Sequence, residues 1–335
     1  MSTPDPQSLA AALDTIPDPA GSGGLIAAGR AAPPRLAADG AVSLILDVTG
    51  LDPAQAKALE ETARVTLAAV PGVTAVRIAT TAEKIERRLI AVGSGKGGVG
   101  KSTLAANLAI ALHRLGRKVG LVDADIYGPS QPRLMAAEGM KPTADNRMLI
   151  PVATRFGVPM LSMGQLVEAD KAIAWRGPMA SSALGQLIDA RWAPADTLVV
   201  DLPPGTGDVQ LSMIQKHRPA GAVIVSTPQD LSLIDAARAI DLFRHANIPV
   251  LGVVENMAGY ACPHCGEISN PFGIGGAEAE ADRLGVPFLG RVPLDPAIRK
   301  ASDAGDPPAA AEGARAEPFL AIARGVIAGL NLRPR

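Results

Sequence analysis

The chain has 335 residues, 47% of them hydrophobic, which is enough for one large or two ordinary domains with a sizeable core. Its 32 Lys and Arg against 33 Asp and Glu offer no basic excess for sequence-independent nucleic-acid binding. No apolar run approaches the roughly 18 residues of a membrane span, and the first residues, MSTPDPQ, lack a signal-peptide layout, so we expect a cytoplasmic protein that binds neither nucleic acid nor membrane.

Residues 1–83 are expected to form a small α/β domain. The predicted elements are a helix over 8–16, a strand over 41–48, a helix over 53–70 that Asp52 caps, and a strand over 73–79. With its LDTIPDP and PGV segments, this unit resembles the MIP18-like domain found ahead of some ATPases. Such domains often carry a cysteine, and this one has none. We therefore expect a docking or regulatory module without metal chemistry, followed by a linker over 84–88.

The second expected domain, 89–335, opens on the segment LIAVGSGKGGVGKST. Its residues 95–102 fit the phosphate-loop template G-x-x-x-x-G-K-[ST]. Glycines let backbone N–H groups approach phosphates closely, and the start of the following helix adds its positive dipole end. Lys101 would reach the β- and γ-phosphates, and Ser102 would hold Mg²⁺. The predicted site for ATP and Mg²⁺ consists of Gly95, Lys96, Gly97, Gly98, Val99, Gly100, Lys101, Ser102 and Thr103.

A second lysine, Lys96, lies inside the loop directly after Gly95. Taken alone, Lys96 is explained equally well as a solvated loop charge. Taken together, GKGGVGKST resembles the deviant Walker A motif of the MinD/ParA-like ATPases. The resemblance implies a homodimer in which Lys96 crosses the interface and contacts the phosphates of the partner's nucleotide.

Two apolar strand runs, 119–122 and 197–200, end in aspartates. The alternation of such strands with helical segments predicts a doubly wound, mostly parallel sheet, whose strands carry ligands at their carboxyl ends. Asp201 has the Walker B arrangement, which holds Mg²⁺. Asp123 and Asp125 can position the attacking water or merely cap a turn, and the sequence does not distinguish their roles.

In MinD/ParA-like ATPases, the D-x-D segment is a switch element, so the resemblance implies function for both aspartates. The predicted catalytic residues are Lys96, Lys101, Asp123, Asp125 and Asp201, and the predicted Mg²⁺ ligands are Ser102, Asp123 and Asp201. The same resemblance implies that Asn256, at the end of a later strand, contacts the adenine base, and a strand-end cap is an equally good alternative.

The segments WRGPM (175–179) and DLPPGTGD (201–208) narrow the resemblance further. They are similar to the Mrp/ApbC branch of this ATPase class, the iron–sulfur cluster carriers. The glycines of the second segment also allow a mobile loop that could sense the γ-phosphate.

The only cysteines, Cys262 and Cys265, form a C-x-x-C pair. Such a turn can be a redox dithiol, half a zinc site or half a cluster site. A four-thiolate site needs a second copy of the chain, which again predicts a homodimer. His264 could serve as a zinc ligand, but we expect a turn residue. The Mrp/ApbC resemblance implies a [4Fe–4S] cluster that Cys262 and Cys265 bridge between two subunits.

These features predict an ATPase that receives iron–sulfur clusters from donor proteins and transfers them to apo-proteins. One alternative is a positioning ATPase of the MinD/ParA type. The final predicted helix, 318–330, lacks the basic stripe of a membrane-targeting helix, so we expect it to dock on the core. The other alternative is a nucleotide-gated scaffold clasped by zinc.

Overall fold

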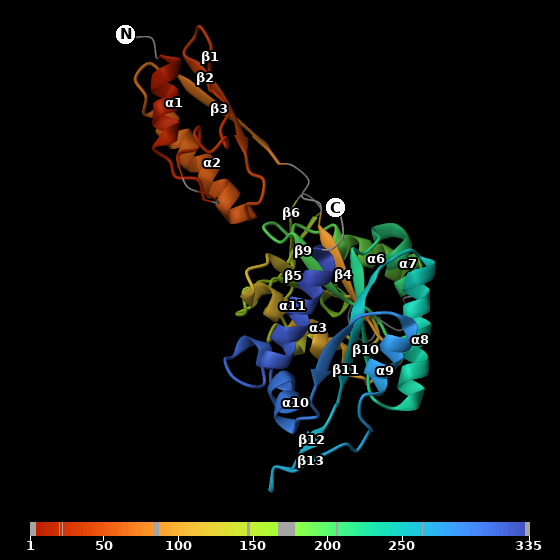
Figure 1. Cartoon of the computed structure of the whole chain (residues 1–335). Coiled ribbons are helices and arrows are strands. Elements are labelled where there is room, and N and C mark those ends of the chain that lie inside the picture. The colour runs from red at the N-terminus through yellow and green to blue at the C-terminus, as the bar shows by residue number, and fades with distance from the viewer. Residues whose placement is uncertain are drawn as a thin grey trace. The chain divides into compact units, whose positions relative to one another are not determined.

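The computed structural model describes residues 5–19, 21, 23–82, 87–145, 148–166, 178–205, 207–262 and 264–331. The chain divides into two compact units, residues 1–86 and residues 87–335. Each unit has a sheet and helices of its own (Figure 1).

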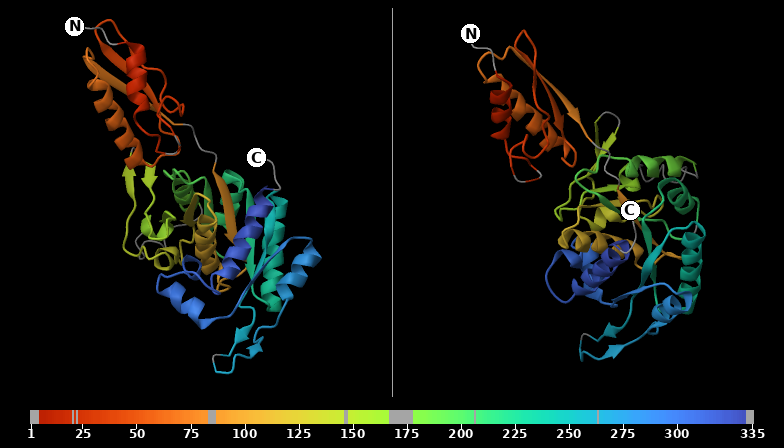
Figure 2. Two further views of the ribbon diagram at one scale, coloured as in Figure 1. Left: turned by 60° about the vertical axis from the view of Figure 1, so that its left-hand side comes forward. Right: turned by 45° about the horizontal axis from the view of Figure 1, so that its top comes forward.

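The first unit is a three-stranded sheet with two helices on one face (Figure 2). Strand β2 (Ala41–Asp47) pairs antiparallel with β1 (Arg35–Leu36) and parallel with β3 (Ala75–Thr81). Helices α1 (Pro6–Asp14) and α2 (Pro53–Ala68) pack leucines against alternate residues of β2, including Val42 and Leu44. Asp52 and Gln55 form a reciprocal capping box at the start of α2, which confirms the predicted helix start.

The second unit is built on a seven-stranded sheet in the order β14-β11-β10-β4-β9-β5-β8. Its strands are β4 (Arg88–Gly93), β5 (Val119–Asp123), β8 (Met160–Ser162), β9 (Thr197–Asp201), β10 (Gly221–Ser226), β11 (Val250–Asn256) and β14 (Phe288–Val292). Every adjacent pair is parallel, which confirms the predicted parallel α/β sheet. All carboxyl ends therefore meet at one edge, where β4 lies between β9 and β10.

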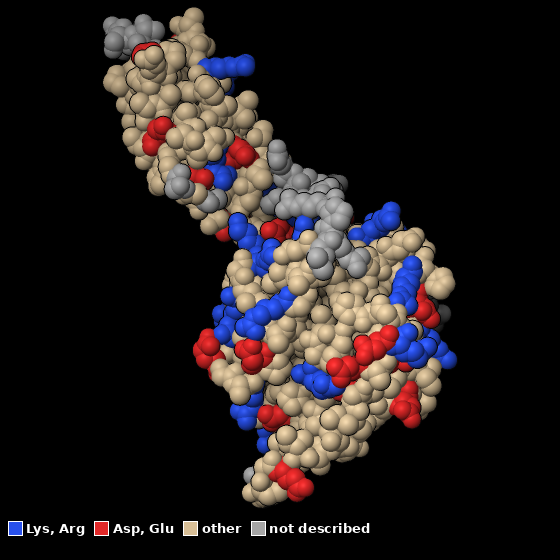
Figure 3. All heavy atoms as spheres, viewed as in Figure 1, with Lys and Arg blue, Asp and Glu red and all other residues tan. Residues whose placement is uncertain are grey.

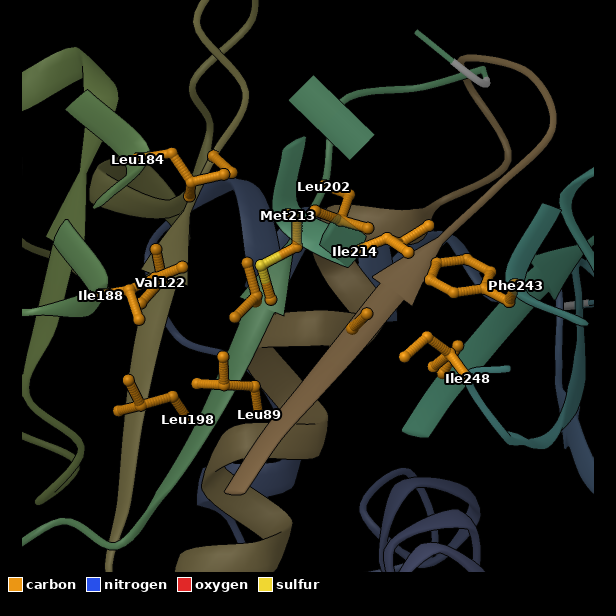
Figure 4. Close-up of a cluster of buried hydrophobic side chains, with 14 of the residues drawn as sticks. Leu89, Val122, Leu184, Ile188, Leu198, Leu202, Met213, Ile214, Phe243 and Ile248 are labelled. Carbon is orange, nitrogen blue, oxygen red and sulfur yellow. The ribbon is translucent and has the colours of Figure 1, made fainter. Parts of the chain in front are cut away.

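Helices cover both faces of this sheet. One face carries α6 (Pro178–Ile188), α7 (Asp208–His217), α8 (Asp230–His245) and α9 (Gly276–Leu284), and the other carries α3 (Lys101–Arg114), α4 (Gln131–Leu134), α10 (Pro296–Asp303) and α11 (Glu317–Asn331). Each face of the sheet has its own hydrophobic core, and alternate residues of β4 point into one or the other. Leu89 packs in the core on the α8 side (Figure 4), and Ile90 packs in the core on the α3 side. A strand buried on both faces has no polar face, as the continuous apolar runs in the sequence predict.

The short elements complete the second unit. They are the hairpin of β6 (Thr143–Asp145) and β7 (Met148–Ile150), helix α5 (Met163–Leu166), the hairpin of β12 (Tyr260–Ala261) and β13 (Ile268–Ser269), and the 3₁₀ turn η2 (Pro308–Ala310). The predicted motif over 175–179 falls mostly outside the described residues. On the face drawn in Figure 3, positive and negative side chains of the second unit are interspersed.

The last helix, α11, docks on the core, as expected. Phe319, Ile322 and Val326 are buried, and the helix packs against α3 and β14. No helix in the described ranges is both long and apolar enough to cross a membrane.

Phe243 of α8 is fully buried beneath the phosphate-loop strand, with its ring against Gly93 of β4 (Figure 4). We expect Phe243→Ala to lower the free energy of unfolding by about 3–5 kcal/mol, because the variant buries less apolar surface and also leaves a cavity. Val65 of α2 is 60% exposed, so Val65→Ala should change the free energy of unfolding by less than about 0.5 kcal/mol. Urea unfolding of the two variants measures both values, and equal losses would contradict this account of the core.

Candidate functional site

The phosphate-binding loop joins the carboxyl end of β4 to the first turn of α3. Gly100, which precedes the helix, has φ +86°, a conformation that favours glycine. A Cβ on Gly95 would lie 2.1 Å from the backbone oxygen of Asp235 in α8, so only glycine fits there. The loop therefore packs against α8 at Gly95 and leads into the N-terminus of α3. A glycine-rich loop that ends at a helix N-terminus is suited to binding phosphates.

The centre of the candidate site is a buried ion pair. The Nζ of Lys101 bonds to Oδ1 of Asp201, with only 6% of Lys101 and none of Asp201 exposed. The same Nζ lies 3.4 Å from the Oγ of Ser102. The ammonium therefore occupies the space between a hydroxyl and a carboxylate, two oxygen ligands that suit Mg²⁺. These two groups fit the predicted metal site.

Asp123 lies beside this pair. Cα partners in the register of β5 and β9 include Asp123 and Asp201, so the two carboxylates emerge next to each other. Oδ2 of Asp123 accepts hydrogen bonds from the Oγ of Ser162 at 2.9 Å and from the backbone N–H of Gln131 at 3.1 Å. Burial, and then the adjacent Asp201 charge, raise the pKa of Asp123 to about 8. The metal-free site thus favours one protonated carboxyl.

Asp125 has a different environment from Asp123. Its Oδ1 accepts from the backbone N–H groups of Tyr127 and Gly128, each at 3.1 Å. This is the bonding of an aspartate that holds a turn, one of the two roles expected from the sequence. Its part in positioning water stays a prediction.

Lys96 and Val99 of the loop each contact a side chain from another part of the unit. Nζ of Lys96 lies 3.5 Å from Oε1 of Gln229, the residue before α8. The Val99 side chain is buried in the core, and its carbonyl accepts from Nδ2 of Asn256 at 2.8 Å. Asn256 therefore ties the end of β11 to the loop, and its adenine contact stays a prediction.

The cysteines lie on the β12–β13 hairpin. Cys262 is half-buried and Cys265 exposed, and both thiols are free. The pKa of Cys262 is lowered by the backbone N–H of Cys265, by that of His264, and by the Cys265 thiol. The thiolate is the metal-binding form. Among the described residues, no group of three or more His, Cys, Asp or Glu side chains is arranged to hold a metal ion.

The base of the hairpin is fixed near the nucleotide loop. The backbone N–H of Ala258 donates to Val292 at 3.0 Å, and that of Leu294 donates to Gly259 at 2.9 Å. Both bonds join the hairpin base to the end of β14. Asn256, which contacts the phosphate-binding loop, precedes Cys262 by six positions.

Two side chains that bond to the predicted site residues were not predicted from the sequence. Gln131 bonds to Ser102 and Asp201, and Ser162 bonds to Asp123. Neither belongs to a motif, and only the order β9-β5-β8 brings their segments to the site. The one available signal was the position of Gln131 shortly after the D-x-D segment.

Comparison with known proteins decides the family. The model of the NUBPL iron-transfer P-loop NTPases, within the ParA group, matches residues 85–327. The chain belongs to this family.

This NUBPL-type NTPase has relatives that match over most of its length. An iron–sulfur cluster carrier protein of Deinococcus radiodurans is 42% identical over 97% of the chain and 96% of its own length. Another carrier, from Pseudomonas fragi, is 51% identical over 68% of the chain and 79% of its own length. The nucleotide-binding protein of Archaeoglobus fulgidus, solved with ADP, is 41% identical over 69% of this chain and 87% of that one, with a TM-score of 0.56.

The cell-division ATPase MinD of Pyrococcus furiosus also has this fold. It is 26% identical, with a TM-score of 0.54, and the match covers 72% of this chain and 98% of that one. The α/β P-loop NTPase fold of the second unit is therefore shown by both sequence and structural comparison.

The ion pair of the NTPase site yields a double-mutant prediction. Lys101→Met leaves the buried Asp201 carboxylate without its cation and should cost about 3–5 kcal/mol of unfolding free energy. Adding Asp201→Asn removes the unpaired charge and should restore most of that loss. Chemical denaturation in EDTA without nucleotide measures both variants. A double variant no more stable than Lys101→Met would show that the pair does not carry this energy.

Asp123 gives the protein a specific pH dependence. Because its pKa is raised from 3.8 to about 8, the folded state holds a proton that the unfolded state has lost between these values. The stabilisation from Asp123 is thus full below pH 4 and declines as pH rises toward 8. We expect wild type to lose stability relative to Asp123→Asn by about 1 kcal/mol or more between pH 5 and pH 8. Parallel melting profiles in EDTA would contradict the raised pKa.

Proposed function

We propose that this NTPase binds a [4Fe–4S] cluster through Cys262 and Cys265 of two chains and transfers it to apo-proteins. ATP binding and hydrolysis at the phosphate-binding loop would control the cycle. The observation that carries the proposal is a pair of free thiols on a hairpin whose base adjoins the nucleotide loop, in a chain of the iron-transfer family. The names of its carrier relatives support the same cargo.

The chemistry of the hairpin suits such a cargo. Iron prefers soft anionic sulfur ligands, and the lowered pKa of Cys262 favours its thiolate. Cys265 is exposed, so an acceptor protein can reach the cluster. Four thiolates require two chains, since each chain has two cysteines. A site shared by two chains can also release its cargo when the chains separate.

The surface beside Lys96 supports a homodimer. Leu231 and Ile234 in the first turns of α8 are 73% and 52% exposed. Gln229, the contact of Lys96, directly precedes this helix. Exposed apolar side chains beside a functional loop are typical of an interaction surface, and a two-fold contact would place both copies of this surface face to face. Lys96 would then leave Gln229 and contact the partner's nucleotide.

The proposed nucleotide chemistry follows from the buried pair. Phosphates would draw the Lys101 ammonium away from Asp201, and Mg²⁺ would be held by Ser102, Asp201 and Asp123. The metal would neutralise the charge of the transferred phosphoryl group. Asp123 or Asp125 would orient the attacking water, and Asn256 would contact the adenine.

Coupling between the two sites is proposed to run through β11. Asn256 at its end holds the nucleotide loop through Val99, and the hairpin with Cys262 follows within six residues. A change in the loop could therefore shift the hairpin base and loosen the cluster. The segment of Gly205 to Asp208 is a second proposed sensor of the γ-phosphate.

The first unit is proposed to be a MIP18-like docking or regulatory domain that recognises donor or acceptor proteins. It has its own core, and the Deinococcus relative aligns over 97% of the chain. Its lack of cysteine supports a role in recognition rather than in metal binding.

The proposal is tested by cluster transfer under anaerobic conditions. The protein is loaded with iron and sulfide, desalted and mixed with an apo-acceptor whose activity needs a four-iron cluster. We expect wild type to activate the acceptor. The variant Cys262→Ala, Cys265→Ala should fail because it has no thiolate for iron.

Two further arms sharpen this transfer test. Lys96→Ala should slow ATP-dependent transfer by about tenfold or more, since it removes a charge aimed at the phosphates. Arg283→Ala is a matched control, because Arg283 is an exposed cation that forms an ion pair with Glu280 of its own helix and lies outside the proposed α8 surface. Acceptor activation by the double cysteine variant would refute the cargo site, and zinc in place of iron would favour a zinc-clasped scaffold.

A further inference from the structure

The side chain of Gln131 is completely buried at the start of α4, beside the proposed metal ligands. Its Nε2 donates to the backbone oxygen of Ser102 at 2.9 Å and to Oδ2 of Asp201 at 2.8 Å. Both neighbours are acceptors, so only the nitrogen of the amide can face them. These two bonds fix the orientation of the amide, so that Oε1 faces neither of the two acceptors.

The Oε1 of Gln131 is a buried acceptor with no hydrogen-bond partner among the described residues. Buried polar atoms are nearly always paired, and an unpaired one is destabilising. The missing partner must be a hydrogen-bond donor, and the amide that carries Oε1 lies within hydrogen-bond distance of both Ser102 and Asp201. Mg²⁺ bound by few protein oxygens keeps several waters, and each such water is a hydrogen-bond donor.

We propose that Gln131 is a positioning residue for Mg²⁺, acting through both ends of its amide. Nε2 holds Oδ2 of Asp201 and so leaves Oδ1 to the cation. Oε1 accepts a hydrogen bond from a water on the metal. The inference rests on the proposed function, which assigns the metal to Ser102, Asp123 and Asp201.

The Lys101 contact supports this division of the Asp201 carboxylate. The ammonium bonds to Oδ1, while Gln131 occupies Oδ2. A cation thus already lies on the oxygen that Gln131 leaves available. When Lys101 moves to the phosphates, Mg²⁺ can take the same oxygen without any rearrangement of the carboxylate.

Gln131 also contacts Asp123, the third proposed ligand of the metal. Its backbone N–H donates to Oδ2 of Asp123 at 3.1 Å. One residue therefore contacts Ser102, Asp123 and Asp201. Occupation of the metal site would fix the start of α4 and, through it, the segment that follows Asp125.

The test is Mg²⁺ affinity, measured on the purified full-length protein with a fluorescent N-methylanthraniloyl-ADP. Gln131→Met keeps the length of the side chain and removes both polar ends. Loss of such an outer contact should weaken Mg²⁺ binding about tenfold or more. Affinity for the same ADP in EDTA should change less than about twofold, because the phosphates are not contacted by Gln131.

Gln210→Met is the matched control. Gln210 is 1% exposed, donates from Nε2 to Pro203 at 2.7 Å and has no partner for its Oε1 among the described residues. Within the described part of the chain, it forms no hydrogen bond with Ser102 or Asp201. It should leave Mg²⁺ affinity unchanged. Gln131→Asn keeps the amide but is too short for both contacts, so it should weaken Mg²⁺ binding too and replaces the Met variant if that one does not fold.

A folded Gln131 variant with wild-type Mg²⁺ affinity would overturn the proposal, as would equal weakening by Gln210→Met. Failure of cluster loading would refute the cargo and leave this assay intact. A wild-type protein with no Mg²⁺-dependent signal would instead refute the nucleotide site, and this inference with it.

Discussion

The structure depends on one buried ion pair, Lys101 with Asp201, at the carboxyl edge of the large sheet. A lone charge cannot be buried there, so each residue requires the other. The pair forms only because β4 and β9 are neighbours in parallel register. The glycines of the loop then bring the first turn of α3 over the sheet edge. The same geometry leaves an oxygen-lined space that a lysine or a metal ion can occupy.

In the proposed cycle, an exchange of cations would link the nucleotide chemistry to the rest of the unit. If Lys101 follows the phosphates, a second cation would take its place on Asp201, because the carboxylate stays buried. The same cation would displace the proton that the raised pKa of Asp123 favours. The cysteine hairpin is joined to this region through Asn256 and the end of β14. The proposed coupling between a change in charge at the loop and the thiols would follow this short path.

The sequence was sufficient where chemistry is encoded in neighbouring residues. The loop glycines are followed directly by Lys101, and Asp201 directly follows an apolar strand, so both can be recognised in the sequence. The structure brings Lys101, Ser102, Asp123 and Asp201 together, as these patterns predict. It was insufficient where function depends on strand order. Gln131 and Ser162 reach the site only through β5 and β8, and β8 is three residues long, too short for a periodic pattern.

The most direct test of the account is the iron content and mass of the anaerobically reconstituted protein. We predict about four irons and four sulfides for every two chains, in a complex with the mass of a dimer. Both the colour and the bound iron should be lost in the Cys262→Ala, Cys265→Ala variant. A full complement of iron on a single chain, or iron retained by the variant, would contradict a cluster shared between two copies of the hairpin.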